Sequence, residues 1–143
     1  MQTENAPRYG LPDVVTHQSV FEAVCEHLIR QGRPSIVLDD ECLYRGPDRT
    51  ACAGGCLISD HLYKQEMEGQ RMNERFIAAY LPEAGHVAPM ILSLQRVHDS
   101  QDLWLDGGEA FDLRELRAEL RSVGTQYGLI LPGILADEAP VPA

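Results

Sequence analysis

The chain has 143 residues and a mass of 15.9 kDa, with 12 Lys and Arg against 22 Asp and Glu, so its formal charge is −10. That length fits one domain, and an apolar content of 44% is typical of a folded globule and too high for a disordered chain. The acidic charge argues against general nucleic-acid binding and against docking on anionic membranes, because both depend on clustered Lys and Arg.

The beginning of the chain predicts a soluble, cytoplasmic protein. It has neither the basic region nor the apolar segment of a secretory signal, and no apolar run in the sequence approaches the roughly 20 residues that cross a membrane. Residues 1–13 are mostly polar and include two prolines and a glycine, so they are predicted to form a flexible arm.

The first predicted helix has clear ends and a regular apolar face. Thr16 is suited to be its N-cap, and Gly32 is placed to end it. Between them, apolar residues recur at helical spacing: Val20, Phe21, Val24, Cys25, Leu28 and Ile29.

The segment after this helix is predicted to be an irregular insert or a short β-hairpin. Residues 46–48 have turn chemistry between two short extended pieces. Residues 51–58 are interpreted as a short buried helix. Their small side chains, including two adjacent glycines, indicate that another element packs close to this backbone. A further turn is expected over 63–67, ended by Gly69.

Three more helices are predicted from apolar residues at helical spacing. Their apolar faces are Met72, Phe76, Ile77 and Tyr80; then Val87, Met90, Ile91, Leu94 and Val97; then Leu113, Leu116, Leu120 and Val123. Residues 136–143 are predicted to be a flexible tail. The sequence therefore predicts a mainly α fold with about four to six helices in one domain over 14–135.

The cysteines leave zinc binding open as an alternative. Cys42, Cys52, Cys56 and His61 follow one another closely, and they are the residue types that hold tetrahedral zinc. Cys42 stands alone, whereas the usual signature has two close pairs of ligands. No cofactor is therefore predicted, and zinc on these four residues is kept as the alternative. Cys25 is interpreted as a small buried hydrophobe.

Four polar residues of the insert are the candidate binding residues. Tyr44 and Arg45 offer an aromatic face and a planar cation that suit an anion or a base. Asp60 and Glu68 complete the candidate set. The alternative is structural: Arg45 pairs with Asp60 or Glu68 and fastens the insert to the helices.

No catalytic residue is predicted. A nucleophilic pair drawn from Cys52 or Cys56 with His61 or His98 lacks a recognisable signature, and its distances do not follow from the sequence. A His98–Asp99 pair is unfavourable because adjacent helical residues point about 100° apart. His98 is interpreted instead as a helix-end residue or a polar member of the core.

The insert and a later helix carry the distinctive motifs, which are YRGP at 44–47, CAGGCLISD at 52–60, MEG at 67–69 and LQRVHD at 94–99. Together they resemble a family of small proteins encoded by tailed bacteriophages and prophages, over roughly residues 16–128. Members of that family have a glycine after the hairpin turn, where this chain has Asp48 and Arg49. The resemblance implies an accessory protein of the bacterial cytoplasm, or of the host cytoplasm if phage-encoded, and implies no activity.

The leading functional hypothesis is non-catalytic binding to a bacterial host protein, as a modulator or inhibitor. The acidic charge favours a basic partner. A monomer and a homodimer both fit the sequence, and a non-enzymatic role is favoured over an enzymatic one. The alternatives are a small zinc-stabilised domain and a small-molecule binder with its pocket at the insert, residues 42–69.

Overall fold

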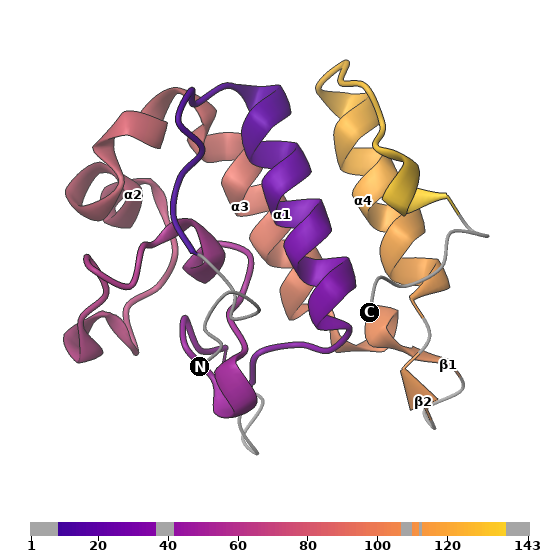
Figure 1. Cartoon of the computed structure of the whole chain (residues 1–143), viewed down its shortest axis with the longest axis horizontal. Coiled ribbons are helices and arrows are strands. Elements are labelled where there is room, and N and C mark those ends of the chain that lie inside the picture. The colour runs from indigo at the N-terminus through magenta and orange to yellow at the C-terminus, as the bar shows by residue number, and fades with distance from the viewer. Residues whose placement is uncertain (1–8, 37–41, 107–109, 112, 137–143) are drawn as a thin grey trace, which may run out of the picture.

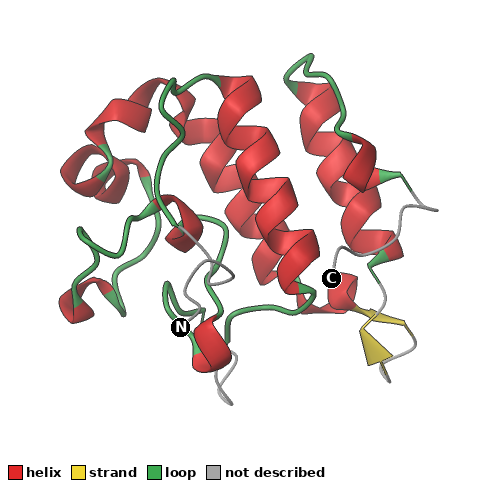
Figure 2. Cartoon of the chain, in the orientation of Figure 1, coloured by secondary structure: helices red, strands yellow, loops and turns green. Residues whose placement is uncertain are grey.

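The computed structural model describes residues 9–36, 42–106, 110–111 and 113–136. It confirms a mainly helical, single-domain fold (Figures 1 and 2). The α-helices are α1 (His17–Gln31), α2 (Glu74–Tyr80), α3 (Ala88–Asp99) and α4 (Arg114–Gln126). Strands β1 (Leu105–Asp106) and β2 (Ala110–Phe111) pair antiparallel. Short 3-10 turns cover Pro47–Arg49, Gly55–Leu57, Gln65–Met67, Pro82–Val87, Gln101–Trp104 and Gly133–Leu135.

Helix α1 begins and ends where the sequence predicts. The Oγ1 of Thr16 accepts a hydrogen bond from the Ser19 amide at 3.0 Å, and the Ser19 hydroxyl accepts one from the Thr16 amide at 2.9 Å. This reciprocal capping satisfies amides that a helix start otherwise leaves free. At the other end, Gly32 has a φ of 74°, which favours glycine, and its amide donates to the Leu28 carbonyl.

Helices α1, α3 and α4 lie side by side (Figure 1), and together with buried apolar residues between positions 44 and 67 they supply most of the apolar core. The predicted apolar face of α1 is fully buried, as are Met90, Ile91 and Leu94 of α3 and Leu116 and Leu120 of α4. Each such side chain contributes about 1.5–3 kcal/mol by leaving water. Among the described residues, no helix is long and apolar enough to cross a membrane.

The chain after α4 is fastened back onto the helices. The Arg117 Nε donates to the Ile134 carbonyl at 3.0 Å, and an Arg121 Nη1 donates to the Leu135 carbonyl. Gln18 of α1 bonds both the amide and the carbonyl of Ile130. The predicted tail at 136–143 lies outside the described residues except for its first residue.

The predicted N-terminal arm is described only from Tyr9 onward, because residues 1–8 lie outside the described part. Tyr9 donates its hydroxyl to the Arg49 carbonyl at 2.7 Å. The Gly10 amide donates to the Cys56 carbonyl at 2.9 Å. This end of the predicted arm is therefore packed on the domain.

Within the segment between α1 and α2, residues 42–72 are called the insert below, which adds three residues to the predicted insert at 42–69. Its irregular character is confirmed. The predicted hairpin around residues 46–48 forms no strands: Pro47–Arg49 is a 3-10 turn, across which the Gly46 amide donates to the Thr50 carbonyl at 2.8 Å. An isolated bridge joins Ile36 and Cys42, outside the predicted hairpin. Asp48 and Arg49 have φ values of 57° and 65°, in the left-handed region that favours glycine.

The predicted helix over residues 51–58 is wrong. Among these residues only Gly55–Leu57 is helical, as a single 3-10 turn. The backbone of Gly55 lies against the backbone of Tyr44, so closely that a Cβ at position 55 would come within 2.5 Å of the Tyr44 carbonyl oxygen. The interpretation of the small residues as a site of close packing is therefore confirmed, and that long-range contact fixes the local chain path.

Candidate functional site

Arg45 links distant parts of the insert through its guanidinium. Its Nη1 donates to the carbonyls of Gly55 at 2.7 Å and Tyr44 at 3.2 Å. Its Nη2 donates to the Ile58 carbonyl at 2.6 Å and to Asp60 Oδ1 at 3.0 Å. The Arg45–Asp60 ion pair is the one that the structural alternative requires.

Aromatic rings and a second carboxylate complete this arrangement. The guanidinium carbon lies 4.5 Å from the ring centre of Tyr9 and 4.9 Å from that of Tyr63. Glu68 accepts bonds from the amides of Tyr44 and Arg45, each at 3.0 Å, and from the Tyr63 hydroxyl at 2.6 Å. We call Tyr9, Tyr44, Arg45, Asp60, Tyr63 and Glu68 the Arg45 cluster.

The polar groups of the Arg45 cluster form hydrogen bonds with one another and with the backbone of the insert. Burial and the Glu68 carboxylate raise the pKa of Tyr63 to about 12, so its hydroxyl remains a donor at neutral pH. The structure brings the four predicted binding residues together, but their hydrogen bonds run within the insert. Of the four, Tyr44 also lines a pocket.

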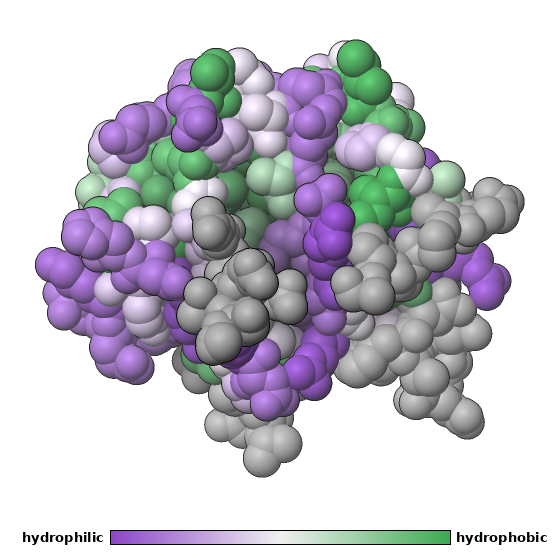
Figure 3. Space-filling view, in the orientation of Figure 1, coloured by the Kyte–Doolittle hydropathy of each residue, from purple (hydrophilic) through white to green (hydrophobic). Residues whose placement is uncertain are grey.

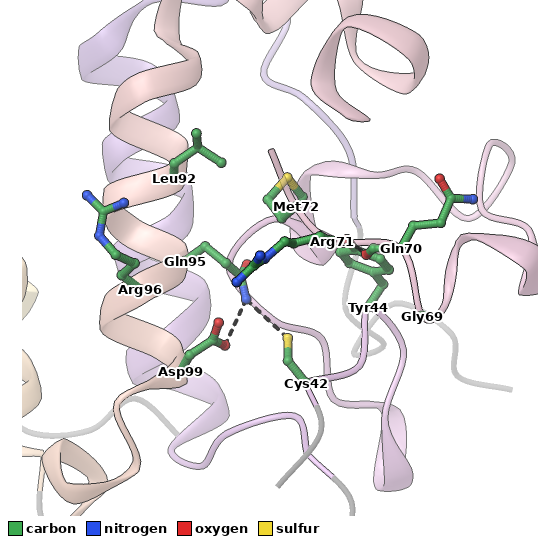
Figure 4. A pocket seen from close by; sticks show the side chains of 10 residues that line it. All are labelled: Cys42, Tyr44, Gly69, Gln70, Arg71, Met72, Leu92, Gln95, Arg96 and Asp99. Atoms are coloured by element: carbon green, nitrogen blue, oxygen red, sulfur yellow. Dashed lines mark hydrogen bonds between the residues drawn. The ribbon is translucent and has the colours of Figure 1, made fainter. Parts of the chain in front are cut away.

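That pocket, with a volume of about 510 Å³, lies between the insert and α3 (Figure 4). Met72 of the insert and Leu92 of α3 lie near one end, and Cys42 and Asp99 lie near the other. Arg71 extends between these ends from the insert toward α3. The pocket thus combines an apolar end, a cation and a polar wall.

Gln95 organises the polar wall. Its Oε1 accepts the Gly54 amide at 2.8 Å, and because an amide N–H can only donate, this contact fixes the orientation of the side chain. Gln95 Nε2 therefore faces Cys42 Sγ at 3.1 Å and Asp99 Oδ1 at 2.9 Å. Both hydrogens of this NH₂ group are in use.

His98 lies fully buried behind this wall. Its Nε2 accepts the Ser35 amide at 2.9 Å, and its Nδ1 lies 2.9 Å from Asp99 Oδ1. The Trp104 ring packs edge-on against the imidazole, and its Nε1 donates to the His98 carbonyl at 3.0 Å. Burial lowers the pKa of His98, but the hydrogen bonds with Asp99 and Cys42 raise it by more.

The Ser35 contact determines which nitrogen of His98 carries a proton. In the neutral ring Nε2 is an acceptor, so the proton is on Nδ1; in the charged ring both nitrogens carry one. Nδ1 is therefore a donor in either state. It cannot withdraw a proton from Cys42, and it has no lone pair to give a metal ion.

The ligand atoms of Cys42, His98 and Asp99 lie within 4.8 Å of one another, which is the spacing of a metal site. Gln95 Nε2 already bridges two of these groups. In known sites the second nitrogen of a ligating histidine donates a hydrogen bond, whereas here Nε2 accepts one. The group therefore forms a hydrogen-bonded wall in this conformation.

The predicted zinc set is not assembled. Although all four of its residues are described, no three of their ligand atoms meet within the same distance. The Cys52 Sγ accepts the Gly55 amide, Cys56 donates to the Ala53 carbonyl, and His61 is exposed. Only Cys42 belongs to the group that the structure forms.

Cys42 is not arranged as a nucleophile. The neighbouring Cys52 thiol and burial raise the pKa of Cys42 well above its ordinary value, so the reactive thiolate is disfavoured. With Nδ1 of His98 acting as a donor, the group has no base for this thiol.

The spacing of polar residues in α3 is the sequence signal that indicates this wall. Gln95, His98 and Asp99 stand at spacings i, i+3 and i+4, so they lie along one side of α3. The interpretation of His98–Asp99 as an unfavourable pair is wrong, because Asp99 is the last residue of α3 and its carboxylate lies beside both His98 and Gln95. The interpretation of His98 as a polar core residue is confirmed.

Comparison with known proteins found no match among family models, curated proteins or solved structures. The resemblance to small bacteriophage proteins stays a prediction from the motifs.

Proposed function

We propose that this chain is a non-catalytic binding protein that holds a small molecule in the pocket between the insert and α3. The pocket itself carries the proposal. Its volume of about 510 Å³ is in the range of small-molecule sites, and it combines an apolar end with a few oriented polar groups. This corresponds to the small-molecule alternative, with α3 as an additional wall.

The walls of the pocket are held in place before any ligand binds. Gln95 joins α3 to the insert through Gly54 and Cys42. Tyr44 stacks on Phe76 of α2, with ring centres 5.0 Å apart, and donates its hydroxyl to the Gln70 carbonyl at 2.6 Å. Preorganised walls lower the ordering cost of binding and so favour a binding role.

A host-protein partner is compatible with this proposal. The predicted bacterial partner, the bacterial cytoplasm as its location, and the choice between monomer and homodimer stay predictions of the sequence. The protein would then bind its partner with the small ligand present in the pocket.

A fragment screen followed by ¹H–¹⁵N NMR tests the proposal. We expect fragments to shift the amides of Gln95, Arg71 and Met72. Leu92→Trp, which fills the apolar end, should abolish these shifts, whereas Ala78→Trp on the exposed side of α2 should preserve them. Circular dichroism checks that both variants fold. Fragments that bind elsewhere, or that bind Leu92→Trp as well as the parent, would overturn the proposal.

A further inference from the structure

The polar atoms of the pocket differ in how much hydrogen-bonding capacity they have left. The polar hydrogens of the Gln95 amide and of the Tyr44 hydroxyl are all used, on Cys42, Asp99 and Gln70. Asp99 Oδ1 accepts two donors, from Gln95 and His98. Among the side-chain donors that line the pocket, the arginines therefore have the most N–H groups left.

Arg71 is the strongest remaining donor. It lines the pocket and reaches across it toward α3 (Figure 4). Arg71 is exposed, and within the described part of the chain it makes no hydrogen bond or ion pair, in contrast to Arg45, whose two Nη atoms make four hydrogen bonds. A guanidinium presents five N–H groups in a planar fork that matches a carboxylate or a phosphate.

One cation and one anion face the pocket. Its charged lining residues are Arg71, Arg96 and Asp99, but the Arg96 side chain extends from α3 away from the other lining residues in Figure 4 and donates to Ser93. Two hydrogen bonds to Asp99 reduce the effect of its charge. Arg71 is therefore the cation that a ligand in this pocket would meet.

The apolar end defines the rest of the ligand. Met72 and Leu92 are both partly buried, and both pack on the core. Arg71 extends into the space between them and the polar wall in Figure 4. A flat or branched apolar body would rest on these two side chains while its charged group meets Arg71.

We propose that the ligand of this pocket is a small organic anion, with a carboxylate or phosphate group bound by Arg71 and an apolar body against Met72 and Leu92. This inference rests on the proposed function and adds the ligand class to it. Both ligand classes have the same two parts, which are a planar or tetrahedral oxyanion and an apolar group that carries it.

Three probes of similar size test the charge requirement: benzoate, phenyl phosphate and the neutral benzamide. Binding is followed by ¹H–¹⁵N NMR titration of the full chain. We expect at least one of the two anions to bind about tenfold more tightly than benzamide, because a charge-assisted hydrogen bond contributes on the order of a factor of ten. Preference for benzoate or for phenyl phosphate then identifies the ligand as a carboxylic acid or a phosphate ester.

Paired variants attribute the effect to Arg71. Arg71→Ala should weaken anion binding about tenfold and leave benzamide unchanged, whereas Arg75→Ala on the exposed side of α2 should change neither. Asp99→Asn keeps an acceptor oxygen but removes a negative charge, so it should strengthen anion binding about threefold. This gain in affinity cannot result from a misfolded variant.

The outcomes separate the two proposals. Equal binding of benzoate, phenyl phosphate and benzamide, abolished by Leu92→Trp, would overturn the anion and leave the pocket as a binding site. Anion binding that is unaffected by Arg71→Ala would also overturn the anion proposal. If no probe or fragment shifts the pocket amides, both proposals fail.

Discussion

The insert and the helical part of this protein satisfy their backbone groups in different ways, although both contribute buried apolar side chains to the core. Helices α1, α3 and α4 pack through apolar side chains that are fully buried, with backbone hydrogen bonds satisfied within each helix. The insert has little regular structure, and charged side chains bond its carbonyls and amides. Arg45 bonds three carbonyls, and Glu68 accepts two amides.

The difference shows how a segment with only short 3-10 turns and no α-helix can still form a fixed wall. Backbone groups removed from water need partners, and in the insert side chains provide them. Figure 3 shows this face of the molecule, with hydrophilic surface over part of the insert and apolar surface near the upper ends of the helices. A polar arrangement of this kind depends on a few residues, whereas an apolar core spreads its free energy over many.

The largest effect is expected from Arg45→Ala, which removes the centre of the Arg45 cluster. It leaves the Gly55 and Ile58 carbonyls without their donor, and we expect the free energy of unfolding to fall by about 3–4 kcal/mol. Urea unfolding measures this. Arg75→Ala is the matched control and should change the free energy by less than about 0.5 kcal/mol. A similarly small loss in Arg45→Ala would show that the insert is not held by this residue.

In the helical part, Leu94→Ala tests apolar packing. Leu94 is fully buried in α3, and its truncation should lower the free energy of unfolding by about 3 kcal/mol. The same urea experiment applies. The exposed Ala79→Gly on α2 serves as a control for helix propensity, with a cost of about 1 kcal/mol. A loss in Leu94→Ala no larger than this control would contradict the account of the core.

His27 joins the two regions and should make stability depend on pH. Its Nε2 bonds the Ala51 carbonyl at 2.7 Å, and burial lowers its pKa to about 4. Between its ordinary pKa of about 6.5 and pH 4 the unfolded chain binds a proton that the folded chain does not, so stability falls as the pH falls. We expect His27 to account for about 2 kcal/mol of loss between pH 7.5 and pH 5.

The comparison of parent and His27→Gln isolates this contribution, because the other titrating groups are shared. Urea unfolding at several pH values should give a shallower pH dependence for the variant. Parallel curves for the two proteins would show that His27 does not resist protonation in the folded state.

The smallest effect expected is a gain. Arg49 has a φ of 65°, and glycine adopts that conformation without strain. Arg49→Gly should therefore raise the free energy of unfolding by about 0.5–1 kcal/mol, and its carbonyl remains available to the Tyr9 hydroxyl. Thermal unfolding measures the gain. A lower melting temperature would mean that the Arg49 side chain stabilises this turn.

How far the sequence predicts the structure also differs between the two regions. The ends of α1 and the buried faces of α3 and α4 follow from local patterns: an N-cap, a glycine with positive φ and apolar residues at helical spacing. The path of residues 51–58 depends on the contact between Gly55 and Tyr44, which no local pattern contains.

The candidate site was harder to predict for the same reason. Its wall joins Cys42 of the insert to Gln95 and Asp99 of α3, far along the chain. The local clustering of cysteines favoured Cys52 and Cys56, whose thiols bond nearby backbone groups instead. The sequence leaves the role of Arg45 open between binding and structure, and its hydrogen bonds include the Asp60 pairing that the structural alternative requires.

Hydrogen exchange of individual amides, measured by NMR, tests the central claim most directly, namely that polar side chains hold the insert as a fixed wall against α3. Glu68 accepts hydrogen bonds from the amides of Tyr44 and Arg45, and Gln95 accepts one from the amide of Gly54. We expect these three amides to be protected from exchange nearly as strongly as the amide of Leu94. In Arg45→Ala the insert amides should lose protection before those of α3. Exchange of the insert amides at nearly unprotected rates in the parent protein would contradict the account.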